Sequence, residues 1–322
     1  MEKFRWCFIG TGALARAIAP SLLESGRHLI TSVYSRRLES SQDFTSKFGG
    51  VAYDNPKEAI SRDDVDGVYV VTPHSSHHEY TKLALELGKP VLNEKAFTLN
   101  AKSTKNLIEL ARSKDIYLAE AMWTWFAEPP YKVREWINND YIGKVKRAKF
   151  TYFMPPQDPN GRLFDPERGG GALLDIGIYP ITYAYRLFGY PEDIICRGHV
   201  KGGVDLHEKI ILKYKDEMFV ECFVSMVGAD YEEGMEIFGE KGKIYAKDFH
   251  TNDTVHLEAE EESKDFTGTV GYLNEFDKVA GEIQSGATES VYVPHKATYD
   301  VMKIMDECRR QMNLYYPAEN LF

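Results

Sequence analysis

The sequence has few cysteines, and their spacing is unlike that of a disulfide-rich or zinc-binding protein. The four cysteines stand at positions 7, 196, 222 and 308, far apart and without a C-x-x-C pair. Such spacing excludes a disulfide framework and argues against a structural zinc site. Cys7, Cys196 and Cys222 lie in apolar stretches, where a buried free thiol is the ordinary outcome. We therefore expect a cytoplasmic protein in a reducing environment.

The chain also lacks an excess of positive charge and any long apolar run. Its 39 lysines and arginines are outnumbered by 49 aspartates and glutamates, which gives a formal net charge of −10. Because phosphate backbones are bound by clustered lysines and arginines, we expect no nucleic-acid partner. No segment approaches the roughly 18 apolar residues of a membrane-spanning helix, so we expect no membrane association.

The first third of the sequence alternates short apolar runs with amphipathic stretches. This alternation is typical of β-α-β units on a parallel sheet, and right-handed crossovers would make that sheet doubly wound. With 322 residues, the chain suits two domains, and we place an α/β Rossmann domain at residues 1–121. The expected strands are Arg5–Ile9, Leu29–Tyr34, Gly67–Val71, Pro90–Asn93 and Ile116–Ala119, and the expected helices are Ala13–Glu24, Leu38–Lys47, Ser76–Glu86 and Ala101–Arg112.

The pattern changes at residue 122, where a second domain, residues 122–322, is expected to begin. Alternating apolar and polar residues separated by turn residues predict an α+β domain with a large open, mainly antiparallel sheet. We leave open that the C-terminal helix packs back near the first domain. The expected strands are Val145–Phe153, Ile194–His199, Glu208–Tyr214, Met218–Val227 and Met235–Phe238. One helix is expected to end near Asn138, and two more are expected at Tyr272–Ser285 and Lys296–Leu314.

A glycine motif follows the first expected strand and opens the first expected helix. Here G-x-G-x-x-A permits a tight turn, a close approach of backbone to a pyrophosphate, and close helix packing. The backbone N–H groups at the helix start would face the phosphates. A purely structural turn is the alternative. We predict a dinucleotide site at Gly10, Thr11, Gly12, Ala13 and Leu14, with Ala15 as the packing residue.

The end of the second expected strand indicates which nucleotide is preferred. An enzyme that uses NAD usually has an acidic residue there, which binds the ribose 2′-hydroxyl. This chain has Ser35, Arg36 and Arg37, with no acidic residue before Glu39. Serine and arginine side chains can hold a 2′-phosphate instead, so we predict NADP(H) in preference to NAD(H). The alternative is a pair of solvated arginines at a helix start.

Two further segments contain candidate functional residues. Lys95 follows a buried strand, at the sheet edge where ligands bind in open α/β sheets, although a surface lysine is the alternative. Three consecutive glycines, residues 169–171, precede Asp175 and Tyr179. We expect that core packing does not explain these glycines and that their backbone passes close to a ligand. On a helix, Asp175 and Tyr179 would project from one face.

Taken together, these motifs resemble the Gfo/Idh/MocA oxidoreductases. The resemblance rests on G-x-G-x-x-A, on Glu94-Lys95, on G-G-G-x-L-x-D-x-G-x-Tyr ending at Tyr179, and on supporting matches between Phe4 and Pro317. Among these, Thr72-Pro73 with His77 resembles a cofactor-side loop. Residues Glu120 to Thr124, with the tyrosine, most resemble the dimeric dihydrodiol dehydrogenases and the NADP-dependent D-xylose dehydrogenases.

The resemblance implies a hydride transfer at the nicotinamide, assisted by an acid/base. Tyr179 matches the residue that exchanges a proton with the substrate oxygen, and Lys95 matches the cation that assists it. Asp175 matches a carboxylate that orients the substrate or this pair. The substrate is expected to be a small carbohydrate, a vicinal diol or a hydroxy-carbonyl compound. The residues that match the cofactor site are Thr72, Pro73, His77, Glu94 and Lys95, beside those already named.

The chain departs from the family pattern at two positions. Ala96 stands where the family usually has proline, often after a cis bond, so the Lys95–Ala96 peptide is expected to be either trans or strained. Trp125 stands where close relatives tend to have arginine. With Trp123 and Phe126, it is expected to form an apolar wall of the substrate pocket, and ordinary packing is the alternative.

The sequence also offers a cluster of histidines and features that bear on alternative functions. His74, His77 and His78 could suggest a metal, but no carboxylate has a convincing spacing, so we expect none. A non-catalytic nucleotide sensor on the same fold is the main alternative to an enzyme. The sheet of the second domain, with Phe219 and Phe223 exposed, is expected to form a homodimer as it often does in this family.

Overall fold

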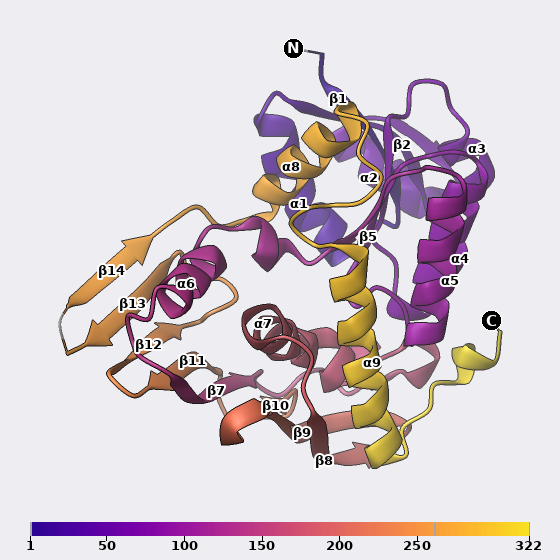
Figure 1. The fold of residues 1–322 in the computed structure, drawn as a ribbon. Helices are drawn as coiled ribbons and strands as arrows, with labels where there is room; N and C mark the ends of the chain where they lie inside the picture. The colour runs from indigo at the N-terminus through magenta and orange to yellow at the C-terminus, as the bar shows by residue number, and fades with distance from the viewer. Residues whose placement is uncertain (1, 261, 322) are drawn as a thin grey trace. The chain divides into compact units, whose positions relative to one another are not determined.

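The computed structural model describes residues 2–260 and 262–321, which divide into two compact units (Figure 1). The described residues of Met1–Thr98, Lys102–Trp123 and Tyr272–Thr298 form the first unit. Those of Leu99–Ala101, Thr124–Gly271 and Tyr299–Phe322 form the second. The division is therefore not the single boundary after residue 121 that the sequence suggested, because a C-terminal segment returns to the first unit.

The first unit is built on a six-stranded parallel sheet. Its strand order, β3-β2-β1-β4-β5-β6, is that of a Rossmann fold and confirms the predicted fold class. The sequence reading missed β3 and α3, which are too short to show a periodicity. The strands are β1 (Phe4–Ile9), β2 (His28–Tyr34), β3 (Val51–Tyr53), β4 (Gly67–Val70), β5 (Val91–Glu94) and β6 (Leu118–Ala121). The helices are α1 (Ala13–Glu24), α2 (Leu38–Phe48), α3 (Pro56–Ile60), α4 (His74–Glu86), α5 (Ala101–Ser113) and α8 (Tyr272–Gln284).

Aromatic packing explains why α8 belongs to the first unit. The ring of Phe276 on α8 lies 5.1 Å from that of Trp6 on β1 and 5.0 Å from that of Tyr69 on β4, measured between centroids. All three side chains are fully buried. Asp277, the next residue on α8, forms an ion pair of 2.7 Å with Arg27. An amphipathic helix from far along the chain thus covers the Rossmann sheet.

The second unit is built on an eight-stranded sheet in the order β14-β13-β12-β11-β7-β10-β9-β8. All pairs are antiparallel except β7 with β10, so the predicted mainly antiparallel sheet is confirmed. The sequence reading missed β12, β13 and β14. The strands are β7 (Val145–Phe153), β8 (Asp193–Lys201), β9 (Val204–Lys213), β10 (Phe219–Ser225), β11 (Glu232–Gly239), β12 (Gly242–Lys247), β13 (Thr254–Ala259) and β14 (Ser263–Thr267). The helices of this half of the chain are α6 (Pro129–Asn138), α7 (Ile178–Phe188) and α9 (His295–Met312).

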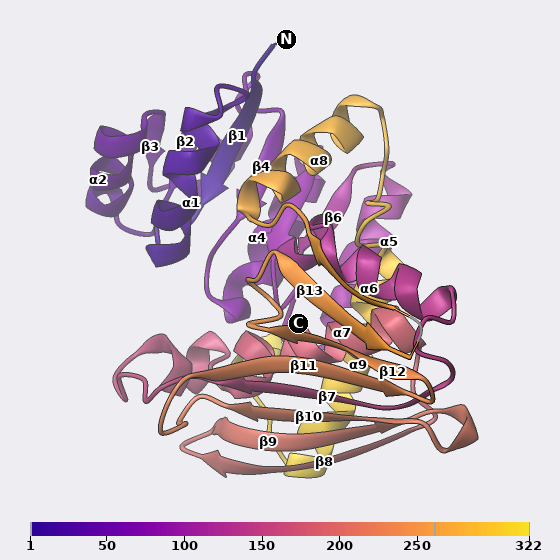
Figure 2. The same cartoon turned by 90° about the vertical axis from the view of Figure 1, so that its left-hand side faces the viewer.

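One face of this sheet is covered by helices, and the other is open. Within the second unit, α7 and most of α9 lie on the same side of the sheet (Figures 1 and 2). The amide of Gln311 on α9 bonds the carbonyl oxygen of Ile194 at 2.7 Å. On β10, Val220, Cys222 and Val224 are buried, whereas the alternate side chains are partly exposed. Along the described parts of the chain, no helix has the length and apolarity that crossing a bilayer requires.

Short helical segments complete the described chain. One of them, Leu173–Gly177, is a π-helix that leads directly into α7. This wide turn occupies the stretch between the glycine triplet and Tyr179, where an α-helical spacing was expected. The others are 3-10 helices, at Trp123–Phe126, Arg162–Phe164, Pro166–Arg168, Lys215–Glu217 and Pro317–Leu321.

Candidate active site

The glycine loop after β1 has the geometry that a dinucleotide site requires. Gly10 has a φ of +119°, and a Cβ atom there would lie 2.5 Å from the carbonyl oxygen of Val71, so a side chain is excluded. At Gly12, a Cβ would meet no atom within 4 Å, which leaves open space above the backbone. Ala15 is fully buried in the helix packing. The geometry at the two glycines fits the separate roles that the motif predicts.

The start of α1 faces this open space. Gly12 is the N-cap residue, and it provides no side-chain hydrogen bond to the helix. The first N–H groups of a helix have no partner within the helix, and the helix dipole adds positive potential there. Thr11, Ala13 and Leu14 are exposed or partly exposed. These backbone groups are thus available to an anion such as a pyrophosphate.

A hollow of about 460 Å³ lies at the end of β2, beside the glycine loop. It is lined by Arg16, Arg37, Glu39, Ser40 and Asp43. Arg37, which the sequence singled out, is exposed and borders this hollow, and Arg36 and the partly buried Ser35 precede it in the chain. The hollow offers the guanidinium groups that a 2′-phosphate would need.

Arg16 is a residue of this hollow that the sequence reading missed. Its Nε donates to the carbonyl oxygen of Thr11 at 3.0 Å, and its guanidinium pairs with Asp43 at 2.9 Å. The guanidinium also lies over the ring of Phe44, 5.5 Å from the centroid. Arg16 thus connects the glycine loop to α2. An arginine one residue past the motif, in the first turn of the helix, was the available signal.

The loop between β4 and α4 lies next to the glycine loop, since Gly10 contacts Val71 and Thr72. Pro73 is the N-cap of α4. His77 is fully buried, and its two ring nitrogens lie 2.8 Å from the carbonyl oxygen of Thr72 and 2.9 Å from that of Ala96. Those carbonyls favour the protonated ring, but burial prevails and lowers the pKa of His77 to about 4. The ring of His77 thus links the loop that contains Thr72 to the loop that contains Ala96. Within the first unit, His77 has no exposed surface for a cofactor.

Lys95 and Glu94 lie at the carboxyl end of β5. One carboxylate oxygen of Glu94 accepts from the hydroxyl of Tyr69 at 2.6 Å, and the other accepts from the backbone N–H of Lys95 at 3.2 Å. Lys95 itself is partly exposed, so its amine is not enclosed by the sheet. The Lys95–Ala96 peptide, left open by the sequence, is cis. This edge of the sheet therefore presents a lysine beside an ordered carboxylate.

Two buried carboxyl groups beside Glu94 were not foreseen from the sequence. Glu120 lies on β6 and accepts from the hydroxyl of Thr298 at 2.8 Å, and burial raises its pKa to about 7. Glu275 on α8 is fully buried, and neither carboxyl oxygen has a hydrogen-bond partner among the described residues. Burial, and then the charges of Glu94 and Glu120, raise the pKa of Glu275 well above its usual range. We infer that Glu275 is protonated near neutral pH.

In the second unit, Asp175 lies on the π-helical turn and is held by one arginine. The guanidinium of Arg162 contacts a carboxylate oxygen of Asp175 at 2.8 Å. Asp175 is 9% exposed at its side chain, whereas Arg162 is 52% exposed. The arginine thus reaches from the surface to orient a nearly buried carboxylate.

Tyr179 lies in the first turn of α7 and packs in a cluster of three rings. Its ring centroid lies 4.8 Å from that of His250 and 6.0 Å from that of Tyr152, and the last two are 4.7 Å apart. His250 lies in the loop between β12 and β13. The sequence reading did not select His250, because no local pattern sets it apart from the other histidines.

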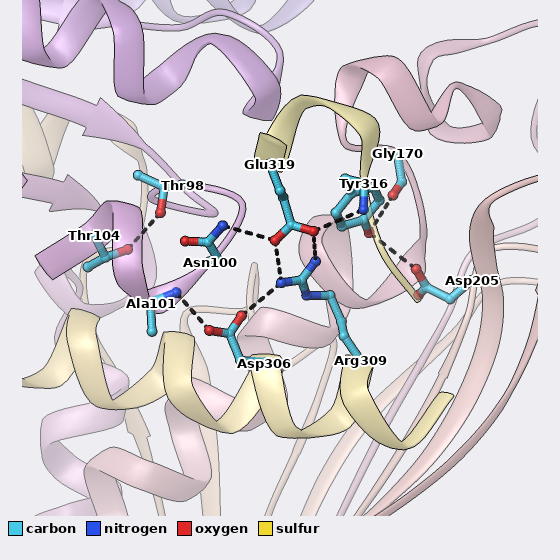
Figure 3. Close-up of polar contacts among 10 residues, drawn as sticks. All are labelled: Thr98, Asn100, Ala101, Thr104, Gly170, Asp205, Asp306, Arg309, Tyr316 and Glu319. Carbon is cyan, nitrogen blue, oxygen red and sulfur yellow. Dashed lines mark hydrogen bonds and ion pairs between the residues drawn. The ribbon is translucent and has the colours of Figure 1, made fainter. Parts of the chain in front are cut away.

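The glycine triplet requires a correction. Gly169, Gly170 and Gly171 are buried, and a Cβ at Gly170 would lie 2.5 Å from the carbonyl oxygen of Leu163. A Cβ at Gly171, where φ is +113°, would overlap the carboxylate of Asp205. The hydroxyl of Tyr316 donates to the carbonyl oxygen of Gly170 at 2.8 Å (Figure 3). Close packing inside the second unit therefore explains Gly170 and Gly171, contrary to the expectation, and Gly169 has a φ of +68°.

The C-terminal segment that contributes Tyr316 is fastened within the same unit. Arg309 on α9 bonds both carboxylate oxygens of Glu319, at 2.9 and 2.7 Å, and also Asp306 at 2.9 Å (Figure 3). The other oxygen of Asp306 accepts from the backbone N–H of Ala101 at 2.9 Å. The arginine is 7% exposed, so these charge-assisted bonds are shielded from solvent.

The three aromatic residues expected to line the substrate pocket have different environments. Trp125 and Phe126 are fully buried in the second unit. Trp125 is enclosed by Tyr131, Tyr183 and the guanidinium of Arg186, 4.5 Å from its ring. This is the packing alternative, so Trp125 is not an open wall. Trp123, in the first unit, is 4% exposed and packs on Tyr272 at 4.9 Å.

Lys95 lies in the first unit, and Asp175 and Tyr179 lie in the second. A role for them in one site is therefore a proposal, taken up below. No group of three or more histidine, cysteine, aspartate or glutamate side chains suited to a metal ion occurs within residues 2–260 and 262–321.

Comparison with known proteins places both halves of the chain in one group. A model of the GFO/IDH/MocA oxidoreductase family, with its NAD-binding Rossmann fold, matches residues 4–121. A model of the GFO/IDH/MocA C-terminal domain matches residues 131–245. Together, the two matches cover more than half of the chain.

Individual relatives match over nearly the full length. A D-xylose 1-dehydrogenase (NADP(+)) of Hypocrea jecorina is 29% identical over 97% of this chain and 93% of its own length. A trans-1,2-dihydrobenzene-1,2-diol dehydrogenase of Xenopus laevis is 29% identical over 97% of this chain and 99% of its own length. The crystal structure of a 3-ketoreductase of Actinomadura kijaniata with NADP and TDP-benzene is similar in fold, with a TM-score of 0.88, 24% identity and coverage of 96% of this chain and 98% of that one.

Proposed function

The chain belongs to the Gfo/Idh/MocA family of oxidoreductases, and from this premise we propose that it transfers a hydride between NADP(H) and a carbohydrate, a vicinal diol or a related hydroxy-carbonyl compound. The observation that carries the proposal is the open glycine loop at the start of α1, with an arginine-lined hollow beside it. The relatives support catalysis, since each is named for a reaction. They do not favour the alternative of a non-catalytic sensor.

The choice of NADP over NAD rests on the hollow at the end of β2. Arg16 and Arg37 line it, and no carboxylate precedes Glu39 at the strand end to bind a ribose hydroxyl. A 2′-phosphate there would receive charge-assisted hydrogen bonds from the guanidinium groups. The name of the Hypocrea jecorina relative specifies the same cofactor. The pyrophosphate would lie on the N–H groups of Gly12 to Leu14.

The proposed chemistry divides the substrate's two hydrogens between cofactor and protein. When bound, the nicotinamide ring accepts the hydride from the carbinol carbon or returns it to the carbonyl carbon. The phenol of Tyr179 takes the hydroxyl proton during oxidation and gives it back during reduction. A free tyrosine has a pKa of about 10. The amine of Lys95 would therefore favour the phenolate and polarise the substrate oxygen, and Asp175, held by Arg162, would orient the pair.

The substrate class is proposed more broadly than any single relative. The two named relatives are dehydrogenases of D-xylose and of a dihydrobenzene diol, and both compounds carry hydroxyl groups. Kinship of fold transfers this chemistry better than it transfers specificity. Of Trp123, Trp125 and Phe126, only Trp123 lies in the first unit. Trp123 remains the proposed apolar contact for the substrate.

We further propose a cytoplasmic homodimer that joins through the open sheet face. On that face, Lys209 lies over the ring of Phe223 at 4.9 Å and Arg147 over that of Phe238 at 4.2 Å. Such half-exposed aromatics with cations suit a self-complementary interface. The four buried free thiols support a reducing compartment. The net charge of −10 supports a small-molecule substrate without nucleic-acid binding.

Two substitutions test the proposed function. Lys95→Ala and Tyr179→Phe should each lower turnover by roughly a hundredfold or more, and Tyr179→Phe should leave NADPH binding within about twofold. Lys105→Ala, an exposed lysine on α5, is the matched control and should turn over normally. Steady-state kinetics and NADPH fluorescence titration provide the two readouts. Retained turnover in both active-site variants would refute the assignment.

A further inference from the structure

We propose that His250 is a positioning residue for Tyr179, and that Glu233 fixes the imidazole in place. The inference rests on the proposed function, because it concerns the phenol that we propose as the acid/base. It assigns a role to a histidine in the loop after β12 and to a buried carboxylate on β11.

Ring packing is the first observation. The imidazole of His250 packs beside two phenols, with centroid distances of 4.8 Å to Tyr179 and 4.7 Å to Tyr152, and the two phenol rings are 6.0 Å apart. The planes of His250 and Tyr179 are tilted by 46°. Tyr179 is 4% exposed and Tyr152 is 7% exposed, so this cluster is nearly closed to solvent. The orientation of the Tyr179 phenol therefore depends on the ring beside it.

Hydrogen bonding is the second observation. One oxygen of Glu233 accepts from the backbone N–H of His250 at 2.7 Å, and the other lies 2.7 Å from its Nδ1. Nδ1 must carry a hydrogen to donate to this carboxylate, and Nε2 lies 3.1 Å from the hydroxyl oxygen of Tyr152. The imidazole is thus held at both nitrogens.

The carboxylate that anchors this chain of bonds is itself fully satisfied. Glu233 has no exposed side-chain surface, and the hydroxyl of Tyr231 donates to it at 2.6 Å, in addition to the two bonds from His250. A buried carboxylate with three donors is an ordered group, and its charge lies next to Nδ1 of the imidazole. It is therefore a fixed anchor for the ring.

The groups that face His250 come from three elements and one adjoining loop residue. Tyr152 lies on β7, Tyr179 on α7, and Glu233 on β11 with Tyr231 just before it. Burial raises the pKa of Tyr152, and the charges of Tyr179, Glu233 and Asp175 raise it further. Burial and the bond to Glu233 likewise raise the pKa of Tyr231. Tyr152 and Tyr231 therefore keep their hydroxyl hydrogens near neutral pH, so the cluster holds its geometry there.

Two consequences follow for catalysis. A phenol that is free to rotate spends less time within reach of the substrate oxygen, so loss of the anchored ring should lower kcat more than it changes KM. The negative charge of Glu233 disfavours a second negative charge nearby. Removing the charge of Glu233 should lower the pH at which the rate of substrate oxidation rises.

Three variants separate the parts of this proposal. His250→Phe keeps a ring but loses both polar bonds, whereas His250→Asn keeps a donor toward Glu233 but loses the ring. Glu233→Gln removes the charge and keeps the shape. His256→Phe is the matched control, because His256 on β13 also pairs with a carboxylate, Asp265 at 2.7 Å, and stacks on a tyrosine, Tyr245.

The pH dependence of kcat and KM is measured for each variant beside wild type and Tyr179→Phe, with circular dichroism to select folded protein. We expect kcat to fall by about 10- to 100-fold in both His250 variants, with KM within about threefold. Glu233→Gln should move the half-maximal pH of oxidation down by about one unit. His256→Phe should match wild type.

The outcomes distinguish this inference from the proposed function. Wild-type kcat in folded His250→Phe or His250→Asn, with Tyr179→Phe inactive, would overturn the role of His250 and leave the proposed function intact. An unshifted pH profile in Glu233→Gln would overturn the role of its charge. Wild-type turnover in Tyr179→Phe would overturn both proposals.

Discussion

Replacing Glu275 by glutamine should stabilise the protein, and the gain should grow as the pH rises. Glu275 is fully buried, has no hydrogen-bond partner among the described residues, and lies near the charges of Glu94 and Glu120. These conditions raise the pKa of Glu275, so the folded chain keeps a proton that the unfolded chain releases above about pH 4.3. Stability from this group is therefore full below that pH and is lost as the pH rises toward the folded pKa.

The magnitude follows from proton linkage. Each pH unit above the unfolded pKa, and below the folded one, costs about 1.4 kcal/mol of unfolding free energy. For a carboxyl that stays protonated in the folded state, the loss between pH 5 and pH 7 is about 2.6 kcal/mol. Glutamine has a similar shape and no charge, so Glu275→Gln should lack this loss.

Urea unfolding at pH 5, 6 and 7, in the absence of cofactor, measures the effect. The difference between Glu275→Gln and wild type should widen by about 2.6 kcal/mol across this range. Glu24→Gln, an exposed glutamate on α1, is the control and should show a nearly constant difference. A constant difference for Glu275→Gln as well would mean that Glu275 is ionised in the folded chain, and would refute the reasoning.

Three other substitutions test separate parts of the structure. Arg37→Ala should weaken NADPH binding by about tenfold while leaving NADH binding unchanged, and equal losses in fluorescence titrations would contradict a 2′-phosphate site. Phe223→Glu should convert the proposed dimer to a monomer in sedimentation velocity, and an unchanged dimer would place the interface elsewhere. Gly171→Ala should destabilise the chain by several kcal/mol, because its Cβ would overlap Asp205, whereas Gly189→Ala, with a φ of +86° and open space, should cost only about 1–2 kcal/mol. Similar losses of unfolding free energy in the two glycine variants would show that the overlap at Gly171 relaxes easily.

The features that the sequence predicted correctly are encoded in contiguous residues. The glycine loop lies between a strand and a helix that both show clear periodicity, and the structure confirms the strand order around it. Arg37 lines the hollow beside this loop, and its contact with a cofactor stays a prediction; it could be selected because its position is counted from the end of β2. In both cases, the local backbone alone determines where the residues lie.

The features that the sequence did not predict depend on contacts between distant segments. His250 and Glu233 are 17 residues apart and meet only because their segments lie side by side in the fold. The glycine triplet was assigned to ligand contact because its packing partners, Asp205 and Tyr316, lie far along the chain. Glu275 left a usable signal, since it is a charged residue next to Phe276 on the buried face of α8.

The most direct test of the central claim is a panel of aldoses, polyols and vicinal diols assayed with NADP+ and with NAD+. The account predicts reduction of NADP+ by at least one of these alcohols, with a higher kcat/KM for NADP+ than for NAD+. It also predicts that Tyr179→Phe abolishes this turnover. A consistent preference for NAD+, or turnover that survives in Tyr179→Phe, would contradict it.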